Sequence, residues 1–403
     1  MKKNYIEKII ILFQIIMLFP VIVFIICIYP IIKIKIFLIE TRAIGHFTLP
    51  MEIFLSELKL KKSQEKRTFY IWFPNKVISN RFLFEKWKEI ISIFPRIIFE
   101  PIFYFFRKIP YGIYFLIPTR HWTEYHSWKK QNNHHDICNV LNKTKPNIIF
   151  SDKEIQEGND YLKKYGLTNL DKYICIAFRN PSYYRNQKII NNFKYSIRDS
   201  NFNNMTKAVE FLLKKNYKIF SLGEKNTVQK YPTEIIQYNN SAYKNNFLDI
   251  FLPFHCSYFI SSATGIDSVA RLNRKKRFIL NFSQISFLWS LEDVDLFIPK
   301  KFKSLSTGKF IPYSEVLKLN LSQYHYLSDL NKDGYDCVSN SEEEIFSAIK
   351  EIDFFYKKKK HLDDGMDYLN KKFRLIYKDY CGYEIKRVKI CNSFLKINKD
   401  LIN

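Results

Sequence analysis

Residues 257–281, SYFISSATGIDSVARLNRKKRFILN, carry the pattern that decides the fold. An apolar strand is expected at 257–260, followed by a Ser- and Gly-containing turn at 261–265. Apolar residues then recur at helical spacing over about 266–272, and a second apolar strand follows at 277–280. Strand, turn, helix and strand in this order predict a βαβ unit with parallel strands.

The same alternation of strand and helix occurs upstream of this unit. Apolar strands are expected at 173–178 and 217–222, and a helix with apolar residues on one face lies between them. Nearer the N-terminus, strands are expected at 34–39 and 69–73. Strands that alternate with helices predict an α/β fold with doubly wound, parallel sheets.

The composition turns polar around residues 131–160, which favours a domain boundary near residue 150. Ser341 and Glu344 have the spacing of a capping box and predict the start of a long terminal helix. We therefore expect four segments: a membrane anchor at 1–32, a first doubly wound domain at 33–150, a second at 151–345 and a C-terminal helical segment at 346–403.

The chain has 403 residues, of which 47% are hydrophobic, and this excludes a disordered chain. Its net charge is +25, from 64 Lys and Arg against 39 Asp and Glu. Such a charge suits an anionic partner, namely nucleic acid, anionic lipid or a phosphorylated substrate. The alternative is that an AT-rich genome encodes many Lys, Asn and Ile residues, which by itself produces an excess of positive charge. Because the basic residues are spread along the whole chain, we expect no nucleic-acid partner.

Metal and cofactor motifs are weak in this sequence. The seven cysteines include no CxxC pair, which is typical of buried, reduced thiols. His134, His135 and Asp136 lack a second ligand pair at metal-site spacing. Asp293 and Asp295 form a DxD triplet, but the triplet follows a loop instead of closing an apolar strand. There is no P-loop, GxGxxG or GxSxG motif. We expect neither a metal nor a cofactor.

Residues 9–29 are almost wholly apolar, and a spanning helix needs about 20 such residues. No cleavage site follows, so we expect an anchor and not a cleaved signal peptide. Pro20 leaves two geometries open: a kinked spanning helix, or a helix–break–helix that dips into one leaflet and returns. The lysines and arginines on the flanks predict that the large C-terminal body stays on the cytoplasmic side of the inner membrane.

The stretch 93–119 mixes aromatic residues and isoleucines with Arg96, Arg107 and Lys108. Rings at headgroup depth and cations on lipid phosphates would make it an interfacial patch on a membrane surface. An ordinary aromatic core helix would have the same composition.

In sheets of this kind, ligands bind beyond the carboxyl ends of the strands. Polar residues follow several of the expected strands: Gly45 with His46, Arg179, Gly223 with Glu224, the loop 261–265 with Ser262, Thr264 and Gly265, and Asn281. A hydroxyl- and Gly-containing loop before a helix leaves free backbone N–H groups, which suit a phosphate or diphosphate. A plain N-cap would use the same residue types.

Two further candidates are cationic or titratable. Arg179 ends an apolar strand and would need an anionic partner, while Arg198 and Asp199 precede the next helix. A structural Arg–Asp ion pair is one reading. Neutralisation of a departing diphosphate by a guanidinium is the other. His46 could take the proton of an attacking hydroxyl near neutral pH, although a single His is more often structural.

Together these segments resemble a family of glycosyltransferases from bacterial surface-polysaccharide gene clusters, which is distantly similar to the heptosyltransferases of glycosyltransferase family 9. The matching pieces, from about residue 36 to the end, are TRAIGH (41–46), AFRNPSYY (177–184), YSIRD (195–199), SLGE (221–224), LDIFLPFHCSYFISSATG (248–265), DLFIPKK (295–301), VSNSEEEI (338–345) and CNSFLKIN (391–398). Their order and spacing carry the resemblance.

The resemblance implies a GT-B-like fold, in which two Rossmann-like domains face each other across a cleft. It implies transfer of a sugar from a nucleotide-activated donor to a lipid-linked or surface-glycan acceptor, in polysaccharide or lipopolysaccharide biosynthesis. The second domain would hold the donor and the first the acceptor. His46 would be the base, at the position of an acidic candidate in heptosyltransferases, and Thr264 and Gly265 would match the donor-phosphate turn. The alternative function is a non-catalytic, membrane-associated glycan-binding or scaffold protein.

Overall fold

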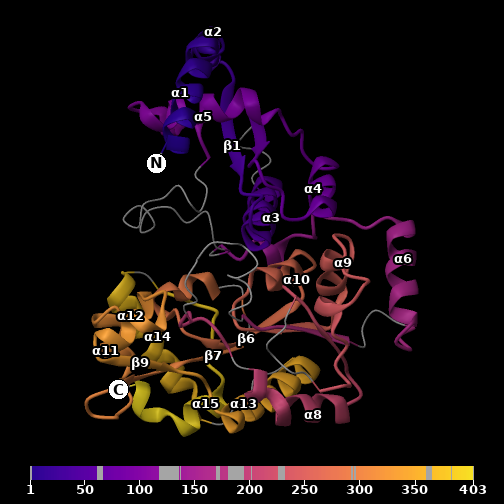
Figure 1. Cartoon of the computed structure of the whole chain (residues 1–403), viewed down its shortest axis with the longest axis vertical. Helices are drawn as coiled ribbons and strands as arrows, with labels where there is room; N and C mark the ends of the chain where they lie inside the picture. Colours follow the sequence, from indigo (N-terminus) through magenta and orange to yellow (C-terminus); the bar gives the residue numbers. More distant parts are fainter. Residues whose placement is uncertain are drawn as a thin grey trace. The chain divides into compact units, whose positions relative to one another are not determined.

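The computed structural model describes residues 2–60, 67–117, 136, 138–168, 173–179, 195–200, 202–225, 232–291, 294, 296–359, 365–382 and 384–402. The chain forms two compact units, Met1–Ile149 and Phe150–Asn403 (Figure 1). Each unit has a parallel sheet and a hydrophobic core of its own.

The larger unit is built on one sheet of parallel strands: β3 (Tyr173–Ala177), β4 (Lys218–Ser221), β5 (Tyr258–Ser261), β6 (Lys276–Phe282) and β7 (Leu296–Pro299). Their order across the sheet is β4-β3-β5-β6-β7. Along the chain, β4 is added on one side of β3, and β5, β6 and β7 are then added on the other side. The strand order therefore reverses between β3 and β5. The parallel βαβ unit predicted from residues 257–281 is confirmed as β5, α10 (Ser268–Leu272) and β6.

Helices cover both faces of this sheet (Figure 1). One layer holds α8 (Thr206–Lys214), α13 (Glu342–Lys358) and α15 (Asn392–Ile397), and the other holds α9 (Leu248–His255) and α10. The predicted apolar face of α8 is confirmed, because Ala208, Val209 and Leu212 are buried. A 3-10 turn precedes this helix, whose N-cap is Met205, and Asn204 Nδ2 donates to the carbonyl of Asn340.

Further elements complete the larger unit: α6 (Asp152–Lys163), α11 (Tyr313–Lys318), α12 (Leu327–Lys332), α14 (Asp367–Cys381) and the antiparallel strands β8 (Lys301–Ser304) and β9 (Tyr335–Val338). The capping box predicted for Ser341 and Glu344 is confirmed at the start of α13, where the Glu344 N–H donates to Ser341 Oγ and the Ser341 N–H to Glu344 Oε2.

The smaller unit has two parallel strands, β1 (Lys33–Ile39) and β2 (Thr68–Pro74), and the helices α1 (Lys2–Met17), α2 (Phe19–Ile28), α3 (Ile44–Leu60), α4 (Arg81–Lys88) and α5 (Arg96–Lys108). Side chains alternate along β1: Ile34 and Ile36 face α2 and α5, while Phe37 packs on Trp72 of β2 and on Phe54 of α3.

A doubly wound sheet was expected for residues 33–150. In the described part of this unit only two strands form a ladder, and single bridges join Leu116 to β1 and Ile93 to β2. The segments beyond them are the aromatic helix α5 and the 3-10 turn η1 (Gly112–Phe115), whose apolar residues follow a helical and not a strand period.

Candidate functional site

The reversal of strand order between β3 and β5 places the carboxyl ends of these strands at a point where open α/β sheets bind ligands. Ala177, the last residue of β3, pairs with Ser261 at the end of β5. Two residues further on, the N–H of Arg179 donates to Ser262 Oγ at 2.8 Å. The fold therefore brings together Arg179 and the loop 261–265, which are far apart in the sequence.

The loop 261–265 is organised by the buried carboxylate of Asp267. That carboxylate accepts hydrogen bonds from the Ser261 hydroxyl and, at 3.0 Å, from the N–H of Thr264, and it pairs with Arg277 at 2.7 Å. The Ala263 N–H donates to Ser261 Oγ at 3.1 Å. The expectation of free backbone N–H groups is therefore wrong for Ala263 and Thr264, because Ser261 Oγ accepts from the first and the Asp267 carboxylate from the second.

Two features of the loop still favour a ligand beyond it. The hydroxyl of Thr264 is buried, and no hydrogen bond is found for it among the residues that the structure describes. Gly265 opens the short helical turn η6 (Gly265–Asp267), so N–H groups at the start of this turn follow the loop directly.

The segment 196–200 lies against the loop and the end of β3. The guanidinium Nη2 of Arg198 donates to the carbonyl of Ala263 at 3.0 Å, and Ala263 has a φ of 59°, a left-handed conformation that is uncommon for Ala. The Ser200 N–H donates to the carbonyl of Arg179 at 2.8 Å. Asp199 accepts from the N–H of Ser196 at 3.0 Å.

Asp199 lies among three cations. Burial raises the pKa of its carboxyl group above the ordinary value, while the N–H of Ser196 and the charges of Arg179, Lys300 and Arg198 lower it less strongly. Arg179 and Arg198 were predicted for this site, and they come together here. Three cations therefore act on the carboxylate of Asp199 at the carboxyl edge of the sheet.

Lys300 is the residue that the sequence analysis missed. It directly follows β7, it is 3% exposed, and its Nζ donates to the carbonyl of Asp199 at 2.5 Å. Burial lowers the pKa of this ammonium group below the ordinary lysine value, although nearby acidic groups oppose the shift. A cation immediately after an apolar strand was the signal that singled out Arg179, and LFIPK at 296–300 has the same form.

Asn281, predicted to bind the donor, is engaged with its neighbours in the protein. Its Oδ1 accepts from the N–H of Asn340 at 2.6 Å, and its N–H donates to Asn340 Oδ1 at 3.0 Å. Its Nδ2 donates to Ser200 Oγ at 2.8 Å. Asn340 also bonds to the carbonyl of Pro299. This network ties β6 to the segments on both sides, so the geometry gives Asn281 a structural role, and a role in donor binding stays a prediction.

Gly223 and Glu224 lie beyond β4, the neighbour of β3 in the sheet. Gly223 has a φ of 101°, which favours glycine, and a Cβ there would meet no atom within 4 Å. Their carbonyl groups accept from Lys244 Nζ at 2.8 Å and from Asn239 Nδ2 at 3.2 Å. Both residues lie at the same edge as Arg179, and a contact with the donor stays a prediction.

His46 belongs to the smaller unit and was expected in a loop. The helix α3 begins earlier, at Ile44, so His46 lies in its first turn and its N–H donates to the carbonyl of Ala43 at 3.0 Å. Near it in sequence, the buried carboxylate of Glu40 accepts from Arg42 Nε and Asn75 Nδ2, both at 2.7 Å. A role for His46 as a base stays a prediction.

Several predicted motifs lie outside the described residues, namely Asp293 and Asp295, His134 and His135, and the stretch 180–194. Within the part of the chain that the structure does describe, no group of three His, Cys, Asp or Glu side chains could hold a metal ion.

No protein-family profile matches this sequence, and no curated protein is similar to it. Three solved structures are similar at low identity. The dodecameric, iron-containing heptosyltransferase TibC, solved with ADP-D-beta-D-heptose, is 10% identical, with 64% of this chain aligned and a TM-score of 0.34. The ADP-heptose lipopolysaccharide heptosyltransferase II of E. coli is 9% identical over 61% of this chain, with a TM-score of 0.34. A family 9 glycosyltransferase of Veillonella parvula is 11% identical over 66%, with a TM-score of 0.38.

This chain is distantly similar to heptosyltransferases. The alignments cover 60% of TibC, 84% of the E. coli enzyme and 86% of the Veillonella protein. The resemblance stated from the sequence names the same group of proteins. With TM-scores below 0.4, the likeness by itself assigns no substrate and no residue, and the site rests on the contacts described above.

Proposed function

We propose that this chain is a metal-independent glycosyltransferase that moves a sugar from a nucleotide-activated donor to a lipid-linked or surface-glycan acceptor, in polysaccharide or lipopolysaccharide biosynthesis. One observation carries the proposal: Arg179, Arg198 and Lys300 lie near the carboxylate of Asp199, at the point where the strand order reverses. Three cations at this edge suit the diphosphate of a nucleotide sugar.

The proposed reaction is a direct displacement at the anomeric carbon. The acceptor oxygen forms a bond to this carbon while the bond from the carbon to the diphosphate oxygen breaks, and His46 takes the acceptor proton. The departing diphosphate gains negative charge in the transition state. Guanidinium and ammonium groups that are already in place would stabilise that charge without reorganising.

In this proposal the larger unit holds the donor and the smaller unit the acceptor, as in a GT-B arrangement. Ser262, Thr264 and Gly265 would meet the phosphates, and Gly223 and Glu224 would lie near the rest of the donor. The body of the chain would work on the cytoplasmic side of the inner membrane, where nucleotide sugars and lipid-linked acceptors meet.

Titration calorimetry with pyrophosphate and with uridine, guanosine and adenosine diphosphates tests the site. We expect Arg179→Ala to weaken diphosphate binding about tenfold or more, since it removes one of three cations. The matched control is Lys276→Ala, because Lys276 lies at the amino end of β6, the opposite edge of the sheet. Equal losses in both variants, or no loss in either, would remove Arg179 from the site.

Sugar transfer is tested with a panel of labelled nucleotide sugars and membrane extracts as acceptor. We expect activity that survives EDTA, and loss of activity in EDTA would direct attention back to Asp293 and Asp295. A glycan-binding or scaffold protein would bind oligosaccharide without binding any nucleoside diphosphate, and this outcome would overturn the proposal.

A further inference from the structure

The outer face of α1 is apolar and uncovered within the smaller unit. Ile9, Leu12, Phe13, Ile16 and Met17 follow the i, i+3, i+4, i+7, i+8 spacing of one helical face, and each is 60–66% exposed. Phe24 of α2 is exposed to 62%. Single exposed apolar residues are ordinary, but a whole helical face of them needs a nonpolar environment.

The inner face of α2, in contrast, belongs to the core of the smaller unit. Ile22 and Ile25 are 0% and 3% exposed and pack in one cluster with Ile34 and Ile36 of β1 and Phe106 of α5. One side of α2 is therefore held by the core of the smaller unit, and its outer side is exposed.

The end of α2 is also held by polar contacts to the turn η1. The Tyr29 hydroxyl donates to the carbonyl of Tyr114 at 3.0 Å, and Lys35 Nζ donates to the same oxygen at 2.5 Å. The rings of Tyr29 and Phe115 lie 4.5 Å apart. The helices α1, α2 and α5 and the turn η1 thus form one module at one end of the smaller unit (Figure 1).

The rim of this module has the composition of a membrane interface. Arg107 and Lys108 are exposed at the end of α5, and Tyr111 and Tyr114 are 78% and 57% exposed beyond them. Exposed Lys33 follows α2, and residues 8–39 contain no Asp or Glu. Exposed cations beside aromatic rings are complementary to anionic lipid headgroups.

We propose that this module inserts α1 and α2 into one leaflet of an anionic bilayer as a re-entrant pair, so that both ends of the pair stay on the side of the larger unit. The pair is bent by 59° at its break. The ten residues of α2 are about 15 Å long, roughly half the hydrocarbon thickness. Across the full thickness, α2 would draw β1 and Lys35 into hydrocarbon, where backbone edges and charges are costly.

No helix of the described chain is long and apolar enough to cross a membrane by itself, and the bent pair passes that test only when its two halves are taken together. Of the two geometries that the sequence left open, a kinked spanning helix and a re-entrant pair, the proposal is the second. It rests on the proposed membrane association and is independent of the sugar transfer.

Co-sedimentation of the full chain with vesicles measures the insertion. We expect binding to vesicles that contain phosphatidylglycerol, and an about hundredfold weaker affinity for Phe13→Glu/Phe24→Glu, since two exposed rings no longer enter the lipid. The matched control is Leu305→Glu/Leu375→Glu, because these side chains are 50% and 58% exposed in the larger unit. Equal losses in both variants, or a stable dimer of the wild-type chain that ignores vesicles, would overturn the inference.

Pyrophosphate binding by the same variants separates this inference from the proposed function. We expect the variant with two glutamates on α1 and α2 to bind pyrophosphate as the wild-type chain does. If vesicle binding is lost and pyrophosphate binding remains, the module acts on the membrane alone. A chain that inserts into vesicles but binds no diphosphate would contradict only the proposed function.

The side of each chain end distinguishes re-entry from spanning. An epitope tag placed ahead of Met1 is digested by protease added to sealed spheroplasts or to inverted membrane vesicles. We expect the tag and the larger unit to be protected together in spheroplasts and cleaved together in inverted vesicles. A tag that is cleaved in spheroplasts while the larger unit is protected would establish a spanning segment and overturn the re-entrant geometry.

Discussion

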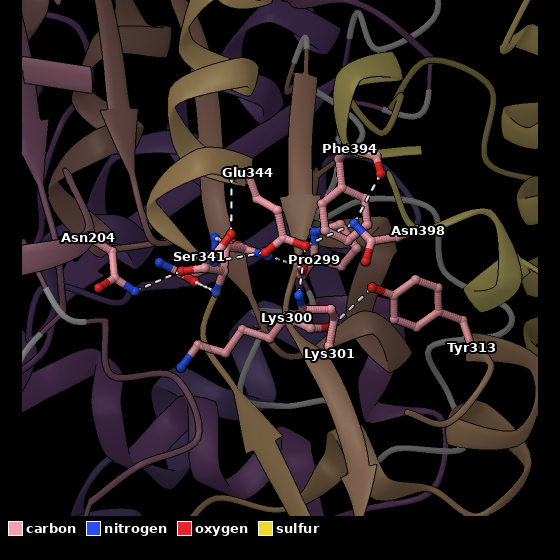
Figure 2. Close-up of polar contacts among 11 residues, drawn as sticks. Asn204, Pro299, Lys300, Lys301, Tyr313, Ser341, Glu344, Phe394 and Asn398 are labelled. Atoms are coloured by element: carbon pink, nitrogen blue, oxygen red, sulfur yellow. Dashed lines mark hydrogen bonds and ion pairs between the residues drawn. The ribbon is translucent and has the colours of Figure 1, made fainter. Parts of the chain in front are cut away.

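Lys300 and Lys301 are neighbours in the sequence and both are buried. Their side chains nevertheless point in different directions (Figure 2), and their ammonium groups have different hydrogen-bond partners. Lys301 opens β8 and meets a carboxylate, whereas the Lys300 side chain points away from that contact and bonds to a backbone carbonyl. The first region is a closed charge network and the second is an open one.

The closed network is centred on Glu344. Its Oε1 accepts from Lys301 Nζ at 2.6 Å and from Asn398 Nδ2 at 2.9 Å, and its Oε2 accepts from the Ser341 N–H at 2.7 Å. Burial would raise the pKa of Glu344, but these hydrogen bonds and the charge of Lys301 outweigh it, so the pKa lies below the ordinary value. Every charge here has a partner within the protein.

The open network contains Asp199 and three cations. Arg179, Arg198 and Lys300 act on the carboxylate of Asp199, and the ammonium of Lys300 donates to a backbone carbonyl. A matched buried ion pair is a structural element, because breaking it leaves an uncompensated charge. Cations that gather at a sheet edge also suit an anionic ligand, as proposed above.

The largest expected effect comes from opening the closed network. Glu344→Gln leaves the ammonium of Lys301 buried without an anion, and we expect the free energy of unfolding to fall by about 3–5 kcal/mol. Urea unfolding followed by circular dichroism measures this loss. The control is Glu343→Gln in the same helix, because the Glu343 side chain is 63% exposed and we expect a change within about 0.5 kcal/mol.

The pH dependence has a defined sign. The pKa of Glu344 is lowered in the folded state. The ionised carboxylate therefore stabilises the protein at pH values above the ordinary pKa of Glu, and this stability is lost as the pH falls through the lower pKa of the folded state. Glu344→Gln should lack this loss. Equal acid sensitivity of the variant and the wild-type chain would contradict the assignment.

Asn281→Ala should cost about 2–3 kcal/mol of unfolding free energy, because it removes the bonds to Asn340 and Ser200 and places Ala at a φ of 54°. We expect the pyrophosphate affinity of the folded variant to stay within about twofold of the wild-type value. A tenfold loss of affinity at unchanged stability would instead make Asn281 a ligand-binding residue, as the sequence alone predicts.

Lys300→Met tests the open network. We expect pyrophosphate to bind about tenfold more weakly, which is about 1.4 kcal/mol, while the unliganded variant is no less stable than the wild-type chain. The control is Lys303→Met, which removes a cation from β8 without touching Asp199. A strong loss of stability without a loss of affinity would make Lys300 a purely structural residue.

The pKa of Lys300 is lowered in the folded state, so burying its charged form costs free energy below the folded pKa. That cost disappears as the pH rises toward the unfolded value of about 10.4. The stability difference between Lys300→Met and the wild-type chain should therefore shrink over this alkaline range. A difference that stays constant with pH would contradict burial as the cause of the shift.

The smallest expected effect is a gain. Asp199→Asn removes the carboxylate that competes with a bound anion, and we expect pyrophosphate to bind about threefold more tightly. Because the pKa of Asp199 is raised in the folded state, its ionised form is destabilising at neutral pH, and the variant should be more stable there. The gain should vanish below about pH 4, where Asp is protonated. Weaker binding would show that Asp199 positions Arg198.

Much of the larger unit could be predicted from the sequence, because apolar strands, polar strand ends and a helical period are local signals. Arg179, Arg198 and the loop 261–265 were singled out in this way and lie together. The role of Asp267 could not be predicted, since it depends on the buried position of Arg277 in the next strand. Lys300 was missed because a KK pair is typical of a solvated strand end.

The smaller unit was less predictable. The residues of α5 follow a helical period, but the sequence does not show that their aromatic rings join Ile34 and Ile36 in one core. Hydropathy does not show whether α2 is surrounded by lipid or packs in the core of the smaller unit, because both environments favour apolar side chains.

The burial of Ile22 and Ile25 in the core of the smaller unit has a practical consequence for anyone who wishes to obtain the chain free of detergent. We do not expect deletion of residues 1–32 to yield a well-folded, water-soluble protein. The deletion would remove two isoleucines from the core and expose Ile34, Ile36 and Phe106 to solvent, so the shortened protein should precipitate. Solubility is better sought by polar replacements on the outward side of the helices, which leave the interior whole.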